Sequence, residues 1–179
     1  MMKNLYLLFL FISITGFSQD KYLTKSGLLN FEASVEAFEE IKATNNNVTA
    51  ILNTANGQFA ALALVKGFRF KNALMEEHFN ENYAESDEFP KAIFKGELTN
   101  FSLENIQTSY SINGTLSFHG VTKALENVSV EITPSENSFS FKGSFEIAPN
   151  DFDIEIPGIV SSKIADSVSV VFDFELVKK

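Results

Sequence analysis

The chain contains two histidines and no cysteine, so few side chains could bind a metal or do thiol chemistry. Neither His78 nor His119 has a second ligand at the spacing of a metal motif such as H-E-x-x-H. His119 precedes Gly120-Val121-Thr122-Lys123, which resembles a turn at a strand end, so we expect a solvated side chain. The sequence therefore predicts no metal site and no cofactor.

Serines and carboxylates are frequent, but they form no catalytic pattern. The chain has no G-x-S-x-G segment, the motif that presents a nucleophilic serine on a sharp turn. The acidic pairs Glu39-Glu40 and Glu76-Glu77 are adjacent in sequence, which is typical of surface charge and not of a general acid and base. We therefore expect that the protein is not an enzyme.

The charge balance narrows the range of partners. The chain has 14 basic and 23 acidic residues and a formal net charge of -9. Nucleic acids and anionic membrane surfaces are bound by clustered lysine and arginine, and the only adjacent basic residues are Lys178 and Lys179. The sequence predicts no nucleic-acid partner.

Residues 1–18 have the pattern of a secretory signal peptide. Lys3 is followed by an apolar run from Leu5 to Ile12 and then by a less apolar stretch ending at Ser18. The run is short for a membrane span, although an uncleaved signal anchor is the alternative. We expect one domain over residues 19–179 and a periplasmic or secreted location. Without cysteine, that domain must be stabilised by its core alone.

Beyond the leader, the dominant hydrophobic period is two, which indicates an all-β protein. Apolar and polar residues alternate most clearly over 110–118, 139–147 and 168–176. Further strands are expected over 29–35, 48–54, 91–98 and 128–132. Asn56-Gly57 and Pro134 to Asn137 predict turns, whereas alternation continues through Asn113-Gly114, which favours a bend within a strand.

Two segments depart from this alternation. The apolar run within 58–70 predicts a strand covered on both sides. Met75, Phe79 and Tyr83 recur at i, i+4 and i+8, which predicts a short helix with Glu76 and Glu77 facing water. Such a helix could close the mouth of a barrel or pack on its outside. Period alone does not decide whether the strands stack as a sandwich or close as a barrel.

A family resemblance favours the barrel. Residues 112–123 read I-N-G-T-L-S-F-H-G-V-T-K and match the signature G-x-L-x-x-x-G-V-T-K of the YceI-like family. Residues 75–96, 145–154 and 156–166 are similar to other parts of that family, the last to a branch common in Bacteroidetes, and the likeness spans about 28–177. The resemblance implies an antiparallel eight-stranded lipocalin-like barrel with one short helix. It also implies a lumen that holds a polyisoprenoid in some relatives and a fatty amide in others.

The chain departs from the family where many members have Asn-Arg before an aspartate. Here the sequence is Ala148-Pro149-Asn150, and Asp153 replaces the usual glycine. Any contact between that arginine and a ligand head group is therefore absent from this chain.

An eight-stranded barrel is either filled by its own side chains or holds one small ligand. Ala60, Ala61 and Ala63 beside bulkier residues, and many phenylalanines without polar partners, favour a hollow lumen. The predicted lumen residues are Leu62, Leu64, Phe68, Met75, Phe79, Phe94, Ile112, Leu116, Phe118, Phe139, Phe141, Phe145, Val170, Phe172 and Phe174.

The function that follows is non-catalytic binding or transport of a long-chain apolar or amphiphilic molecule, an isoprenoid or acyl lipid. The alternative is a ligand-free structural or stress-related envelope protein with a packed barrel. The sequence leaves open whether the barrel forms a homodimer.

Overall fold

The computed structural model describes residues 21–35 and 38–179, so the predicted signal peptide lies outside the described residues. Long strands make up most of this part of the chain, together with short helical segments. In chain order the elements are β1 (Lys21–Ser34), β2 (Lys42–Asn53), β3 (Gln58–Leu64), η1 (Val65–Gly67), β4 (Arg69–Phe70), α1 (Ala73–His78), η2 (Phe79–Tyr83), β5 (Lys91–Leu98), β6 (Ser109–Phe118), β7 (Val121–Pro134), β8 (Ser138–Ile147), η3 (Pro149–Phe152), η4 (Ser161–Lys163) and β9 (Ile164–Lys178).

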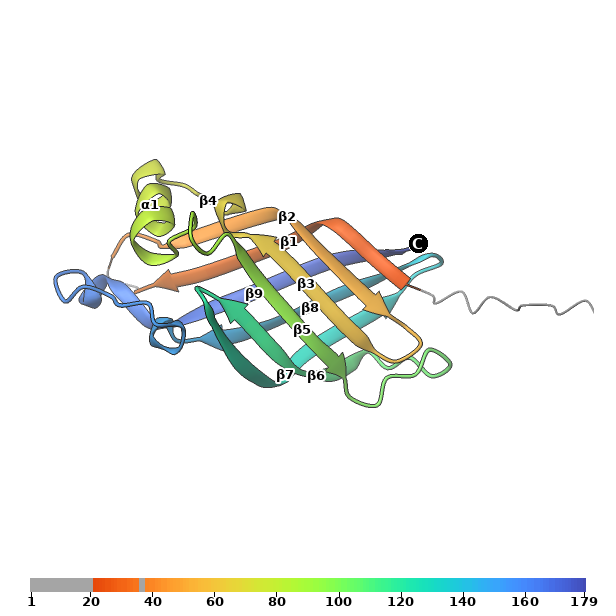
Figure 1. The fold of residues 1–179 in the computed structure, drawn as a ribbon. Helices are drawn as coiled ribbons and strands as arrows, with labels where there is room; N and C mark the ends of the chain where they lie inside the picture. Colours follow the sequence, from red (N-terminus) through yellow and green to blue (C-terminus); the bar gives the residue numbers. More distant parts are fainter. Residues whose placement is uncertain (1–20, 36–37) are drawn as a thin grey trace, which may run out of the picture.

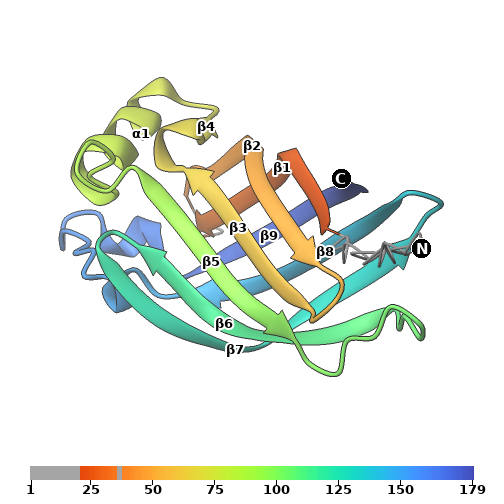
Figure 2. The same ribbon diagram turned by 45° about the vertical axis from the view of Figure 1, so that its right-hand side comes forward.

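The strands form one closed antiparallel barrel (Figures 1 and 2). The sheet runs in the order β1-β9-β8-β7-β6-β5-β3-β2, and a further pairing of β1 with β2 joins its two ends. The two-residue strand β4 lies outside this ring of eight and pairs with the start of β2. The expected eight-stranded barrel is confirmed, and α1 is the single α-helix in the described part of the chain.

The alternating residues of each strand divide between the core and solvent. In β9, Val170, Phe172, Phe174 and Leu176 are all buried, while residues between them are more exposed. β8 follows the same pattern, with Phe141 fully buried beside an exposed lysine. Since successive strand side chains point to opposite faces, the period-two pattern alone places these phenylalanines inside the barrel.

The predicted turns lie where glycine or a polar residue permits them. Gly57 has a φ of 71° and closes the β2–β3 turn, with its N–H donating to Asn53 O at 2.9 Å. His119 and Gly120 both have positive φ, 48° and 73°, as the tight turn between β6 and β7 requires. Asn113-Gly114 lies inside β6, and the register shift beside it confirms the predicted bend.

The prediction that the run after Gln58 is covered on both sides is wrong. β3 ends at Leu64, which is 51% exposed, and only Phe59 and Ala63 in this strand are buried. The inner face of β3 therefore consists of one large and several small residues. The leucines occupy the outer face because alternation assigns them there.

The two ends of the barrel differ. Figures 1 and 2 show α1, the β6–β7 turn and the segment between β8 and β9 at one end, which we call the mouth end. The β2–β3 turn, the β7–β8 turn and the C-terminus lie at the other, which we call the far end. The mouth end thus carries most of the chain that is not part of the sheet.

The close packing at strand glycines can be tested by substitution. A methyl group on Gly114 would overlap the carbonyl oxygen of Lys95 and lie 2.8 Å from Gly96 Cα, so Gly114→Ala should destabilise the barrel by about 1–3 kcal/mol. Gly158→Ala is the matched control, because nothing lies within 4 Å of its ideal Cβ. Urea unfolding followed by circular dichroism should show a lower midpoint for Gly114→Ala alone. Equal midpoints would contradict the close approach of β5 and β6.

Candidate functional site

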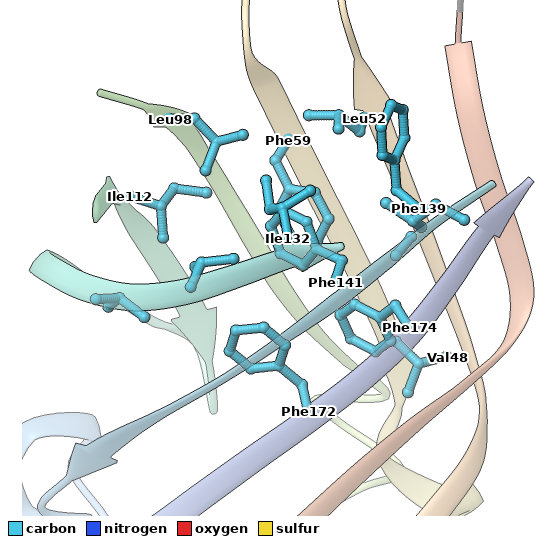
Figure 3. Close-up of a cluster of buried hydrophobic side chains, with 14 of the residues drawn as sticks. Val48, Leu52, Phe59, Leu98, Ile112, Ile132, Phe139, Phe141, Phe172 and Phe174 are labelled. Carbon is cyan, nitrogen blue, oxygen red and sulfur yellow. The ribbon is translucent and has the colours of Figure 1, made fainter. Parts of the chain in front are cut away.

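The middle of the barrel is occupied by a layer of aromatic rings from four strands. We call Phe59, Phe94, Phe141, Phe172 and Phe174 the ring layer (Figure 3 shows four of them). Phe59 and Phe141 stack with centroids 4.4 Å apart, and Phe172 and Phe174 stack at 5.4 Å. Only about 60 Å³ of empty space remains among these rings. The side chains beyond them toward the far end, including Leu52 and Ile132, are fully buried.

Glycines on neighbouring strands make room for the ring layer. A Cβ on Gly143 would lie 2.5 Å from Cζ of Phe172, and one on Gly27 would overlap the ring of Phe174. Gly114 of the neighbouring strand β6 provides the same space for Phe94, and so does Gly96 of its own strand β5, with ideal Cβ atoms 2.8 and 3.0 Å from the ring. The rings therefore lie directly against the backbone of adjacent strands.

Between the ring layer and the mouth end lies a second, larger cavity of about 320 Å³, which we call the mouth cavity. Its wall is almost entirely apolar. The lining residues are Leu29, Phe31, Ala33, Ile41, Phe68, Phe70, Met75, His78, Phe79, Tyr83, Ala92, Leu116, Phe118, Phe145, Ile147, Pro149, Phe152, Ile154, Ile156, Val160, Lys163, Ile164, Val168 and Val170.

One side of the mouth cavity is built from a cluster of aromatic rings. Phe31 of β1 lies 5.2 Å from the centroids of both Phe68 and Phe79, and 5.6 Å from that of Phe70. Edge-to-face and tilted arrangements of this kind stabilise aromatic clusters beyond their burial. The cluster holds β1, β4 and η2 together, so this part of the wall is preformed.

The helix contributes to the wall as its spacing predicts. Met75, Phe79 and Tyr83 all line the mouth cavity. Asn72 caps α1 by accepting a hydrogen bond from Leu74 N at 3.0 Å. The expectation that Glu76 faces water is wrong, because its carboxylate accepts from Phe70 N at 3.1 Å and pairs with Arg69 at 3.1 Å. This carboxylate fastens α1 to β4.

His119 ties together the irregular segments at the mouth end. Its side chain is only 10% exposed, so the expectation of a solvated turn residue is wrong. Nδ1 lies 2.8 Å from the carbonyl oxygen of Phe152, and Nε2 lies 2.9 Å from the carboxylate of Glu85. Each ring nitrogen therefore lies within hydrogen-bond distance of an acceptor oxygen, one on each side of the imidazole. No local sequence pattern indicates these contacts, since the two partners are 33 and 34 residues away from His119.

The structure places twelve of the fifteen predicted lumen residues in the walls of the two cavities. The prediction is wrong for Leu64, which is exposed, and Leu62 lies on the same outer face of β3; Ala61 and Ala63 line the interior instead. Phe139 is buried, but it packs on Tyr22 at a centroid distance of 4.5 Å and lines neither cavity. The residues that line a cavity as predicted are Phe68, Met75, Phe79, Phe94, Ile112, Leu116, Phe118, Phe141, Phe145, Val170, Phe172 and Phe174.

Sequence reasoning missed the contribution of the segment between β8 and β9. Pro149, Phe152, Ile154 and Ile156 line the mouth cavity, and Phe152 is almost completely buried. The available signal was a set of apolar residues in a stretch without strand alternation. Apolar side chains are stabilised by burial against another apolar surface, and here these residues pack over the open end of the barrel.

Polar groups are sparse in this site. Among the cavity-lining residues, His78, Tyr83 and Lys163 carry the ionisable side chains. Over residues 21–35 and 38–179, no group of three or more His, Asp or Glu side chains is arranged to hold a metal ion. No helix within the same ranges is long and apolar enough to cross a membrane.

Comparison with known proteins identifies the family. The model of the YceI-like domain matches residues 22–176, nearly the whole described chain. The chain belongs to the YceI-like family. The predicted resemblance is therefore confirmed, and the mouth cavity and ring layer are features of a YceI-like barrel. No curated protein matches the chain.

Several solved structures share the fold at low sequence identity. A polyisoprenoid binding domain from Saccharophagus degradans, implicated in plant cell wall breakdown, is 16% identical with a TM-score of 0.73, covering 89% of this chain and 98% of that one. BcnA from Burkholderia cenocepacia is 16% identical with a TM-score of 0.70, covering 85% and 96%. The YceI protein of Campylobacter jejuni is 15% identical with a TM-score of 0.64, covering 79% and 86%.

The two histidines offer a matched test of the His119 contacts. His119→Ala should lower the free energy of unfolding by about 1–3 kcal/mol, because it leaves the carbonyl of Phe152 without its partner. His78→Ala should change it by less than about 0.5 kcal/mol, since that side chain is exposed. Urea denaturation measures both, and an equal, small effect for the two variants would contradict the structural role of His119.

Proposed function

We propose that this YceI-like barrel binds a lipid-like apolar or amphiphilic molecule, an isoprenoid or acyl chain, in the mouth cavity and does no chemistry on it. The observation that carries the proposal is the empty volume of about 320 Å³ behind an apolar wall. That volume is within the range of about 300–1,000 Å³ typical of small-molecule sites. The named polyisoprenoid binding of the Saccharophagus degradans domain supports a lipid-like ligand.

The energetics favour a hydrocarbon chain. Each buried methylene contributes about 0.8 kcal/mol, so a chain that fills the cavity needs no strong polar contact. Rigid rings such as Phe31 and Phe118 form the wall, and Met75 from α1 adds an adaptable contact. The site would therefore select ligands by shape and length, with a polar head group left at the mouth.

The sparse polar groups support binding without catalysis. His78 and Lys163 line the cavity but are exposed, and no hydrogen bond joins either of them to Tyr83 within the described residues. A general acid and base must both reach the reacting group, and this apolar wall offers no such pair.

The alternative, a packed scaffold without a ligand, describes only part of the molecule. The ring layer and the far end are packed as that alternative requires. The mouth end is not packed in this way, because a cavity of about 320 Å³ lies between the aromatic cluster and β9. A close-packed interior would leave no such space. The hollow mouth end therefore favours the binding role.

Two adjacent valines in β9 provide a direct test of ligand binding. Val170 is buried in the wall of the mouth cavity, whereas Val171 is 46% exposed on the outer face. Val170→Trp should fill the cavity and weaken binding of the fluorescent probe N-phenyl-1-naphthylamine at least tenfold. Val171→Trp should leave probe affinity unchanged.

The same variants should differ in what they carry from the host. Lipid extraction and mass spectrometry of wild-type protein and Val171→Trp should recover a stoichiometric lipid that Val170→Trp lacks. Wild-type protein that carries no lipid and binds no probe would count against the proposal and in favour of the packed scaffold.

We also propose that the protein acts in the periplasm or outside the cell, delivered by residues 1–18. The basic residue and apolar run of that segment support export. Protein recovered from the cell envelope or medium should have an intact mass that begins at residue 19. A chain that retains Met1 and fractionates with the cytoplasm would refute this location.

A further inference from the structure

We infer that the ring layer is the floor of the binding site, so that the barrel buries only about ten carbons of a single-chain lipid. This inference rests on the proposed function and adds the length of chain that the site accepts. The interior of this barrel is divided by its own phenylalanines.

The volumes on the two sides of the floor are unequal. The mouth cavity measures about 320 Å³, whereas the space within the ring layer measures about 60 Å³. A methylene group needs about as much room as a water molecule, whose share of liquid volume is about 30 Å³. The mouth cavity therefore holds on the order of ten such groups, and the ring layer holds about two.

Phe145 of β8 stands at the boundary between the two spaces. It lines both cavities and lies 6.4 Å from the centroid of Phe172 in the ring layer. Three smaller residues share this boundary, namely Leu29, Ala92 and Leu116. Phe145 is thus the large ring that a chain would meet on reaching the floor.

The floor cannot yield easily. Phe172 rests on the backbone of Gly143, and Phe174 rests on Gly27, so neither ring can move further toward the barrel wall. Phe59 of β3 stacks on Phe141 of β8, with their ring centroids 4.4 Å apart. A ligand tail would have to displace several mutually packed rings to continue toward the far end.

The polar end of the ligand faces the mouth. The ring layer is lined by apolar side chains alone, whereas the exposed His78 and Lys163 lie in the wall of the mouth cavity. A chain therefore enters tail first, and carbons beyond about the tenth stay in water. Lengthening the chain beyond that point does not increase the affinity, because the added methylene groups are not buried.

The test measures affinity against chain length. Straight-chain fatty acids of six to sixteen carbons, kept below their micelle concentrations, displace N-phenyl-1-naphthylamine from the purified protein. Affinity should rise about fourfold per added methylene, the factor equivalent to its burial, and stop rising near ten carbons. We call the chain length at which affinity stops rising the break. Primary alcohols should show the break at the same length, because the floor and not the head group determines it.

Opening the floor should move the break. Phe145→Ala should shift it upward by at least two carbons, because the ring layer becomes accessible from the mouth. Phe139→Ala is the matched control, since Phe139 is buried against Tyr22 and lines neither cavity. Phe145→Leu and Phe139→Leu make the same comparison with a smaller loss of core volume, should either alanine variant fail to fold.

The outcomes separate the two proposals. A wild-type break near ten carbons that moves in the Phe145 variants and not in the Phe139 variants supports the floor. Affinity that climbs steadily to sixteen carbons, or a break that Phe145 variants leave in place, overturns the floor while binding itself stands. Failure of every chain length to displace the probe overturns both.

Discussion

Three phenylalanine rings in the middle of the barrel lie against strand glycines, and the contents of the interior depend on this contact. Phe94, Phe172 and Phe174 each occupy space that a Cβ on a glycine would fill. Because protein interiors pack near the density of organic crystals, rings seated this closely leave only a small void between them. The hollow part of the lumen is what remains on the mouth side of these rings. The interior of this barrel is shaped as much by its glycines as by its aromatic residues.

The wall of the barrel was predictable from the sequence because alternation reports the direction of each side chain. In β9 and β8, the predicted inward residues Phe172 and Phe141 are buried as expected. Alternation failed in β3, where an unbroken apolar run does not show which residues face inward. The prediction places Leu62 and Leu64 inside, whereas the structure places Ala61 and Ala63 there. The small alanine side chains help to keep the interior open.

The extent of the cavity was not predictable in the same way. Whether rings such as Phe141 and Phe145 meet one another or border empty space depends on barrel closure, register and rotamers, none of which a local pattern contains. The same limit applies to His119, whose partners Glu85 and Phe152 belong to distant segments. Family resemblance implies the architecture, whereas the division of the lumen depends on how the side chains pack in three dimensions.

The mouth end is held differently from the wall, and this difference bears on how the proposed ligand would enter and leave. The wall is joined by ladders of backbone hydrogen bonds between neighbouring strands, while α1 and η3 are fastened by individual side chains such as Glu76 and His119. Segments with few such ties open at a lower free energy than the sheet that carries them. Loading and release of the proposed ligand can then proceed through sub-global opening of this cover, with the barrel intact. The residence time of a bound molecule would be governed by a handful of hydrogen bonds remote from the hydrocarbon itself.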